Sequence, residues 1–280
     1  METIDSRNRI ITWNCRRARE DSAIWGYLKE LSPDIALLQE VSGIAPEIMD
    51  MYNIQVTVPI TKSGKPQKFQ TVVLTRGIIS DQFQMGASEE WIARELDIFS
   101  GNLSAFRIDL FDGSKFTVVC VYSPAWPVPS SHLQGIDVSG VKLTQSPDVW
   151  VADLLWASLN FQRPDPSDYW IIAGDFNSSE TFDQWPGGPW GNREYLDRMT
   201  SLGLIECLCN SQGKLTPTFR NPKGGKIKHQ IDDMFVTAGL ATRLIRCHTG
   251  SEERVFGGSL SDHLPVIADF SRNAKKCSQN

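Results

Sequence analysis

Short apolar runs that stop at polar residues are the main pattern in this chain. The clearest run, Ile171–Ala173, has the composition of a buried strand, and Gly174 ends it with a residue that permits close backbone approach. Asp175 and Asn177 follow with one residue between them, so on an extended backbone both side chains leave by the same face. The pattern predicts a carboxylate beside a carboxamide at a strand end, although a strand entering an Asx turn would read the same way.

Apolar segments elsewhere predict further strands, and helical spacing predicts helices between them. A strand over 9–14, a helix over 24–31 and a strand over 34–40 form the order that is typical of a crossover unit. Two more helices are predicted over 151–159 and 195–204. The other predicted strands cover 70–76, 103–109, 115–122, 216–220, 230–237 and 265–270.

Polar side chains suited to metal or phosphate chemistry lie at or near the ends of these predicted strands. They are Asn14, Glu40, Tyr122, Asp175, Asn177, Asp232, Asp262 and His263. Several have an ordinary explanation when taken alone, such as a turn cap for Asn14 or a rim charge for Glu40. Asp232 is harder to explain, because an inward carboxylate in an apolar strand must be paired or ligated. Together these residues favour a functional site.

Composition limits the classes of partner. The 280 residues are 41% hydrophobic, with a net charge of -5 and a pI of about 5.5. No global positive field gathers polyanions, so contact with nucleic acid requires a local basic patch or a bound cation. The most basic stretch carries Arg220, Lys223, Lys226 and Lys228 and leads directly into the Asp232 strand. Because this stretch lies beside the predicted phosphate site, we interpret it as a contact to the nucleic-acid backbone rather than as a solvated loop.

Two long loops follow predicted strands. The first, 123–148, contains four prolines, and the second, 178–193, contains Trp185 and Trp190. Loops of this length in a compact domain are usually functional or mobile. Trp126 and Trp190 could stack on unpaired bases, or each could anchor its own loop.

The chain shows no membrane-spanning run and no apolar leader. Its six cysteines are scattered without a CxxC pair, which is typical of reduced thiols in a cytoplasmic protein. We therefore expect a cytoplasmic location, no membrane association and no obligate protein partner.

Six segments in order resemble the endonuclease/exonuclease/phosphatase superfamily, which includes DNase I-like and apurinic-site endonucleases. They are Thr-Trp-Asn (12–14), Leu-Leu-Gln-Glu-Val (37–41), Val-Tyr-Ser-Pro (121–124), Gly-Asp-Phe-Asn (174–177), Ile-Asp-Asp-Met-Phe-Val (231–236) and Ser-Asp-His-Leu-Pro-Val (261–266). The resemblance implies one domain over 1–272, built as a four-layer α/β/β/α sandwich of two stacked mixed sheets flanked by helices. Residues 273–280 are expected to form a flexible tail.

The resemblance also implies a phosphoesterase that depends on Mg²⁺ or Mn²⁺. Glu40 corresponds to the principal metal ligand, helped by Asn14 and Asp262. Hard oxygen ligands favour magnesium over zinc.

Catalytic roles follow from the same resemblance. Asp175 would position or deprotonate the attacking water, and Asn177 would donate to the scissile phosphate. His263, oriented by Asp232, would stabilise the charge that develops on phosphorus, and Tyr122 would contact the phosphate.

One position departs from the apurinic-endonuclease branch, which has an acidic residue two positions after the Asn of the first segment. This chain has Arg16 there, and an arginine cannot ligate a cation. A second metal is therefore in doubt. Arg16 could instead contact a substrate phosphate or be a solvated turn charge.

Three hypotheses remain for the function. The first is a metal-dependent nuclease acting on DNA or RNA, with Arg16, Arg220, Lys228, Trp126 and Trp190 as substrate contacts. The second is a phosphatase or phosphodiesterase for a nucleotide, inositol phosphate or phospholipid headgroup. The third is an inactive binding scaffold, ranked last because each recognisable active-site position carries a competent side chain.

Overall fold

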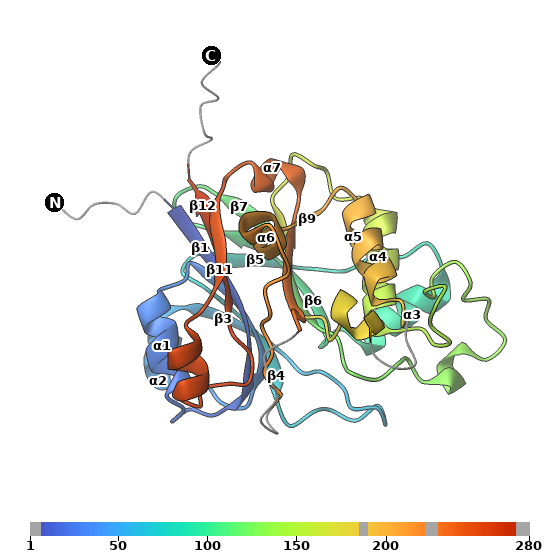
Figure 1. Cartoon of the computed structure of the whole chain (residues 1–280), viewed down its shortest axis with the longest axis horizontal. Coiled ribbons are helices and arrows are strands. Elements are labelled where there is room, and N and C mark those ends of the chain that lie inside the picture. The colour runs from blue at the N-terminus through green and yellow to red at the C-terminus, as the bar shows by residue number, and fades with distance from the viewer. Residues whose placement is uncertain (1–6, 185–189, 222–228, 273–280) are drawn as a thin grey trace, which may run out of the picture.

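Two mixed β-sheets stacked face to face form the centre of the molecule, and helices cover their outer faces (Figure 1). The computed structural model describes residues 7–184, 190–221 and 229–272. The first sheet has the order β11 (Leu244–Thr249), β12 (Val266–Ser271), β1 (Arg7–Ala18), β2 (Ile35–Val41), β4 (Gln70–Thr75) and β3 (Asn53–Thr57). The second has the order β5 (Ile78–Phe83), β6 (Leu103–Asp109), β7 (Lys115–Tyr122), β8 (Trp170–Asp175), β10 (Asp232–Val236) and β9 (Ile205–Glu206). The predicted four-layer sandwich is confirmed.

The helices divide between the two outer faces. The first sheet is covered by α1 (Ile24–Leu31) and α2 (Pro46–Met51), and the second by α3 (Glu90–Ile98), α4 (Val151–Gln162) and α5 (Asn192–Ser201). Two short helices, α6 (Cys207–Gln212) and α7 (Ala238–Ala241), lie near β10 and β11. Single helical turns occupy Ser130–Leu133, Glu180–Gln184 and Glu253–Gly257. No helix in the described ranges is both long enough and apolar enough to cross a membrane.

The structure corrects several predicted boundaries. β1 does not stop at Asn14 but continues to Ala18 through a register shift, in which Arg16 and Arg17 have φ of 47° and 60°. The predicted strand 216–220 is not a strand. Phe219 makes only isolated bridges to His229 and His263.

The long loop 123–148 is packed rather than loose. Val128, Val141 and Leu143 are buried in the core beneath α4 and α5. The predicted tail 273–280 lies outside the described residues.

Asp269 of β12 holds an ionic cluster at the start of β1. Its side chain is 1% exposed and accepts from Arg9 Nε at 2.7 Å, Arg246 Nε at 2.8 Å and Arg7 Nη1 at 2.9 Å. Burial alone would raise the pKa of Asp269, but hydrogen bonds from Arg9 and Arg246 hold it below the usual value. The stabilisation is therefore present above the unfolded pKa and is lost as the pH falls through the folded pKa.

We predict that Asp269→Ala lowers the free energy of unfolding by about 3 kcal/mol, because it removes a buried carboxylate that accepts hydrogen bonds from three arginines. Asp81→Ala is the control, since Asp81 forms an exposed pair with Arg107 and should cost about 0–1 kcal/mol. Urea denaturation at pH 7 measures both values. Equal losses in the two variants would contradict the assignment.

Candidate active site

Strand alternation carries acidic residues to the space between the two sheets. In β8, Ile171 and Ala173 pack in the core between the sheets, whereas Trp170 and Ile172 pack beneath the helices. Asp175 continues the first set, so its side chain enters the same space where the strand ends. The apolar core stops there, and a buried carboxylate takes its place.

The strands on either side of β8, which are β10 and β7, bring Asp232 and Tyr122 to the same edge. In β10, Met234 and Val236 pack between the sheets, and Asp232 has the same parity. Asp232 pairs with Asp175 in the antiparallel ladder, and Tyr122 pairs with Asp175 across β7 and β8. The register therefore fixes these side chains side by side.

Gly174 allows β7 and β8 to approach at this point. A Cβ placed on Gly174 would overlap the backbone carbonyl oxygen of Val121. This is the close backbone approach that the sequence indicated for this residue.

Side-chain hydrogen bonds connect the first sheet to the second at the same edge. They join Asn14 Nδ2 to Asp175 Oδ2 at 2.9 Å, the Tyr122 hydroxyl to Glu40 Oε1 at 3.2 Å, and His263 Nδ1 to Asp232 Oδ2 at 2.9 Å. The predicted residues of β1, β2, β7, β8 and β10 and the segment before β12 thus meet in one cluster.

Asp175 is a carboxyl group with unusual proton affinity. Burial raises its pKa to about 7, although the positive charge of His263 opposes this shift. Its Oδ1 accepts from the Asn177 backbone N–H at 3.0 Å, and its Oδ2 accepts from Asn14. Such a group can exchange a proton near neutral pH.

Asn177 lies beside Asp175, but not through an extended backbone. Its φ is 48°, and its backbone bond to Asp175 Oδ1 closes an Asx turn. The side-chain Nδ2 donates to the Ser123 carbonyl at 2.8 Å and to Asp175 Oδ2 at 3.3 Å. Asp175 and Asn177 are neighbours as predicted, and the backbone between them is the Asx turn of the alternative interpretation rather than an extended strand.

His263 and Asp232 form a buried pair. Burial alone would lower the pKa of His263, but the Asp232 carboxylate more than offsets it and raises the pKa to about 9. The imidazole is therefore protonated at neutral pH, and Nδ1 donates to Asp232 while Nε2–H is left for another acceptor. Thr218 Oγ1 donates to Asp232 Oδ2 at 2.7 Å and fixes the carboxylate.

The model of the Endonuclease/Exonuclease/phosphatase family matches residues 11–263. The chain belongs to the endonuclease/exonuclease/phosphatase family. No relative was matched among curated proteins.

Solved structures of this family share the fold. An AP endonuclease from Archaeoglobus fulgidus aligns with a TM-score of 0.64 and 17% identity over 94% of this chain and 99% of that chain. The 3′ phosphatase NExo from Neisseria, bound to a product DNA hairpin, gives a TM-score of 0.64 and 18% identity over 94% and 99%. The endonuclease domain of TRAS1, a telomere-specific non-LTR retrotransposon, gives 0.56 and 16% over 94% and 98%. At these identities the likeness shows the fold.

A divalent cation fits the donor chemistry of this family member. Carboxylate oxygens of Asp175 and Asp232 lie within 4.8 Å of each other, whereas His263, which lies within the same distance, is protonated and serves as a hydrogen-bond donor rather than a ligand. The raised pKa of Asp175 reflects a buried carboxylate with too little compensating charge, and a cation would supply it. Carboxylate oxygens are the ligands that Mg²⁺ prefers.

The three predicted metal ligands differ in their surroundings. Glu40 accepts from Tyr122 with Oε1, which leaves Oε2 for a cation. The Asn14 side-chain oxygen accepts from the Arg16 backbone N–H at 3.0 Å, and an Asp262 oxygen lies 3.7 Å from Arg16 Nε. Arg16 therefore occupies the vicinity of two predicted ligands, which is consistent with the doubt about a second metal.

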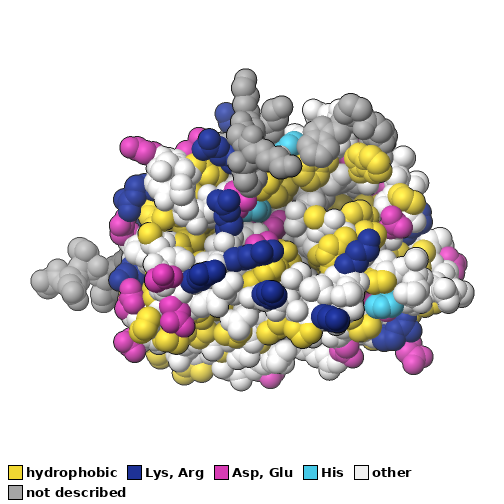
Figure 2. Space-filling model, turned by 90° about the horizontal axis from the view of Figure 1, so that it is seen from below, with side chains coloured by type: hydrophobic (Ala, Val, Ile, Leu, Met, Phe, Trp, Pro, Cys, Tyr) yellow, Lys and Arg dark blue, Asp and Glu magenta, His cyan; other side chains and the backbone are white. Residues whose placement is uncertain are grey.

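Basic side chains surround the cluster. Arg16, Arg17 and Arg220 are exposed, and the Arg220 backbone N–H donates to the Asp262 carbonyl at 2.9 Å. Arg17 lies over the Phe69 ring, 5.7 Å from its centroid. Figure 2 shows the molecule from below, where Lys and Arg side chains gather around a hollow. Lys228 lies outside the described residues, as do Lys223 and Lys226.

The two predicted tryptophans occupy different environments. Trp126 packs against Phe99 with ring centroids 5.8 Å apart, a contact that anchors its loop. Trp190 is 48% exposed and available to a ligand. Trp185 lies outside the described residues.

Sequence reasoning missed two hydroxyl residues that hold the site. Thr218 fixes Asp232, and Ser261 Oγ donates to the Asn14 carbonyl at 2.7 Å while accepting from the His263 N–H at 3.1 Å. Ser261 could have been found because it precedes Asp262 and His263 directly. No sequence pattern pointed to Thr218, because only the folded chain brings its hydroxyl to Asp232.

Proposed function

We propose that the protein is a divalent-metal-dependent phosphodiesterase, and that its substrates are the phosphodiester bonds of DNA or RNA. The observation that carries the proposal is the buried cluster of Asp175, Asp232 and His263 at the edge between the sheets. The cluster combines the carboxyl group of Asp175, which accepts protons near neutral pH, with the protonated imidazole of His263, which faces the same space.

Asp175 would accept a proton from the attacking water. A general base is most effective when its pKa lies near the working pH, and the Asn14 and Asn177 hydrogen bonds hold the carboxylate in one orientation. Water then attacks phosphorus in line with the leaving oxygen, and no covalent enzyme intermediate is required.

His263 would stabilise the negative charge that grows on the phosphate oxygens. Asp232 keeps the imidazole protonated and orients it, so that Nε2–H faces away from the carboxylate. Tyr122 and Asn177 would contact the phosphate by exchanging the hydrogen bonds that they donate to Glu40, Ser123 and Asp175. Burial and the neighbouring carboxylates raise the pKa of Tyr122 and keep its hydroxyl protonated.

Glu40 would hold the cation, with Asn14 and Asp262 as further ligands. When bound, Mg²⁺ or Mn²⁺ would neutralise phosphate charge and assist departure of the leaving oxygen. Exposed Arg16 and Arg220 would contact the substrate backbone, as would Lys228.

A reducing compartment such as the cytoplasm suits the protein. The cysteines within the described residues are free, and most are buried.

A cleavage panel tests the proposal. Supercoiled plasmid, single-stranded DNA, single-stranded RNA and a chromogenic phosphodiester are incubated with the protein in Mg²⁺, with Asp175→Ala beside the wild type. We expect a nucleic acid to be cut, and the variant to be inactive. Hydrolysis of the small diester alone would replace the nuclease with a small-molecule phosphodiesterase, and no hydrolysis of any substrate would favour a scaffold.

A further inference from the structure

Arg16 lies in an irregular turn of β1 at the catalytic edge. Asn14 pairs with Gln39 of β2. The next pair is Ala18 with Val41, so three residues of β1 face one residue of β2. Arg16 has a φ of 47°, which side chains with a β-carbon rarely adopt, and its backbone N–H donates to Asn14 Oδ1 at 3.0 Å. Bulges of this kind turn a side chain toward an active site.

The carboxylates at this edge differ in how many oxygens remain open. Asp175 and Asp232 already accept hydrogen bonds with both oxygens. Within the described residues, Glu40 Oε2 and the two Asp262 oxygens accept none. Mg²⁺ usually binds to a protein through one or two carboxylates and keeps several waters. The open oxygens of Glu40 and Asp262 are therefore enough for one cation.

A guanidinium lies beside the open oxygens of Asp262. Arg16 Nε is 3.7 Å from Asp262 Oδ2, and the Asp262 side chain is only 17% exposed. Two positive charges at such a separation repel each other, and the repulsion is stronger where bulk water is partly excluded. A second cation bound at Asp262 would therefore meet the fixed charge of Arg16.

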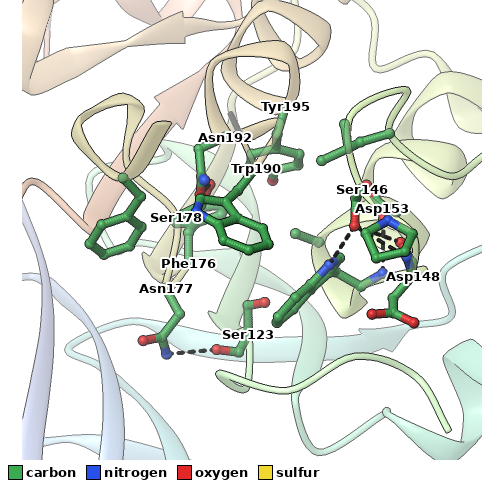
Figure 3. Close-up of a pocket in the computed structure, with 15 residues that line it drawn as sticks. Ser123, Ser146, Asp148, Asp153, Phe176, Asn177, Ser178, Trp190, Asn192 and Tyr195 are labelled. Atoms are coloured by element: carbon green, nitrogen blue, oxygen red, sulfur yellow. Dashed lines mark hydrogen bonds between the residues drawn. The ribbon is translucent and has the colours of Figure 1, made fainter. Parts of the chain in front are cut away.

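Arg16 also has hydrogen-bond donors available for a phosphate. Its Nη1 and Nη2 groups donate to no other group within the described residues, and half of its side chain is exposed. By contrast, the Tyr122 hydroxyl donates to Glu40, and the Asn177 amide donates to the Ser123 carbonyl at 2.8 Å, a bond drawn in Figure 3. A guanidinium presents two parallel donors that match two phosphate oxygens.

We infer that the Arg16 guanidinium takes the place of a second divalent cation: it pairs with Asp262, binds the substrate phosphate and limits the protein to one divalent cation. The inference rests on the proposed metal-dependent reaction and adds the source of the second positive charge. Glu40 would bind the single cation, and Asp262 would lie between that cation and Arg16.

Titration of Mn²⁺ into the metal-free protein, followed by electron paramagnetic resonance, counts the bound cations without substrate. We expect one Mn²⁺ on each wild-type chain. Arg16→Asn removes the repelling charge and should bind one Mn²⁺ about tenfold more tightly, whereas Arg16→Asp adds a ligand and should bind two. Asn and Asp adopt positive φ more readily than most side chains, so both variants suit the turn.

Arg163→Asp is the matched control. Arg163 is an exposed arginine that also has a φ of 47°, and it caps the end of α4. This variant should bind one Mn²⁺ with the affinity of the wild type. Two Mn²⁺ on the wild type, or one Mn²⁺ with unchanged affinity on Arg16→Asp, would overturn the inference.

The phosphate contact is tested by binding of a single-stranded oligodeoxynucleotide in EDTA at several salt concentrations. Arg16→Asn should weaken binding about tenfold at low salt and reduce the slope of log K against log salt by about 0.7, the loss of one phosphate contact. Arg163→Asn should leave the affinity and the slope unchanged. A wild-type slope in Arg16→Asn would show that Arg16 is solvated and would overturn its contact with the phosphate.

Failure of this inference and failure of the proposed function give different results. If the wild type cuts nucleic acid but binds two Mn²⁺, the function stands and the role of Arg16 is wrong. If the wild type binds one Mn²⁺ and Arg16→Asp binds two, yet no phosphodiester is cut, the role of Arg16 beside the cation stands and the nuclease assignment is wrong.

Discussion

Asp175→Asn is expected to lower kcat for cleavage of the preferred nucleic acid by about 10³-fold, the largest effect that the site predicts. The change removes the proton acceptor but keeps the size of the side chain. The hydrogen-bond donors of the Asn14 side chain and the Asn177 backbone remain in place, so the substitution should lower kcat more than it raises KM.

Asp165→Asn is the matched control for this substitution. Asp165 is exposed and lies before the start of β8, whereas Asp175 ends the same strand. Steady-state cleavage of a labelled oligonucleotide at pH 7.5 compares the two variants. An Asp175→Asn enzyme with more than about a tenth of wild-type kcat would show that Asp175 is not the base.

His263→Ala is expected to lower kcat by about 10²- to 10³-fold, since it removes the cation that faces the phosphate. The wild type should lose activity as the pH rises past about 9, where His263 loses its proton. Asp232→Asn removes the charge that raises this pKa, so the alkaline decline should begin at lower pH.

Profiles of kcat against pH from 6 to 10 measure this shift. His263→Gln serves as a second variant that still fills the space beside Phe219, whose ring centroid is 4.9 Å from that of His263. If Asp232→Asn left the alkaline limb unchanged, the pair would not control the titration.

Much of the architecture could be predicted because strand alternation is local. The run Ile171–Ala173 fixed which face Asp175 uses, and the Met234 and Val236 positions did the same for Asp232. The six ordered segments then supplied the topology that brings distant strands together. Edge elements such as β3, β5 and β11 escaped prediction, because their burial is partial and their patterns are weak.

Other features depend on conformations that composition does not encode. Glu40 has φ of 53° and lies where the pairing of β2 with β4 shifts register, so alternation could not place its side chain. The pocket beside Asn177, which several aromatic residues line, was invisible for a different reason. Its lining residues Asp153, Trp190 and Tyr195 come from separate elements and meet only once the helices and loops are packed.

Metal-initiated single-turnover cleavage tests the central claim most directly. Excess protein is mixed with a 5′-labelled single-stranded oligonucleotide in EDTA, and the reaction is started with an excess of Mg²⁺. We expect no cleavage before Mg²⁺, rapid cleavage after it, and about 10³-fold slower cleavage after Mg²⁺ with Asp175→Asn. Cleavage at the same rate in EDTA, or by the variant, would contradict a metal-dependent reaction at the Asp175, Asp232 and His263 cluster.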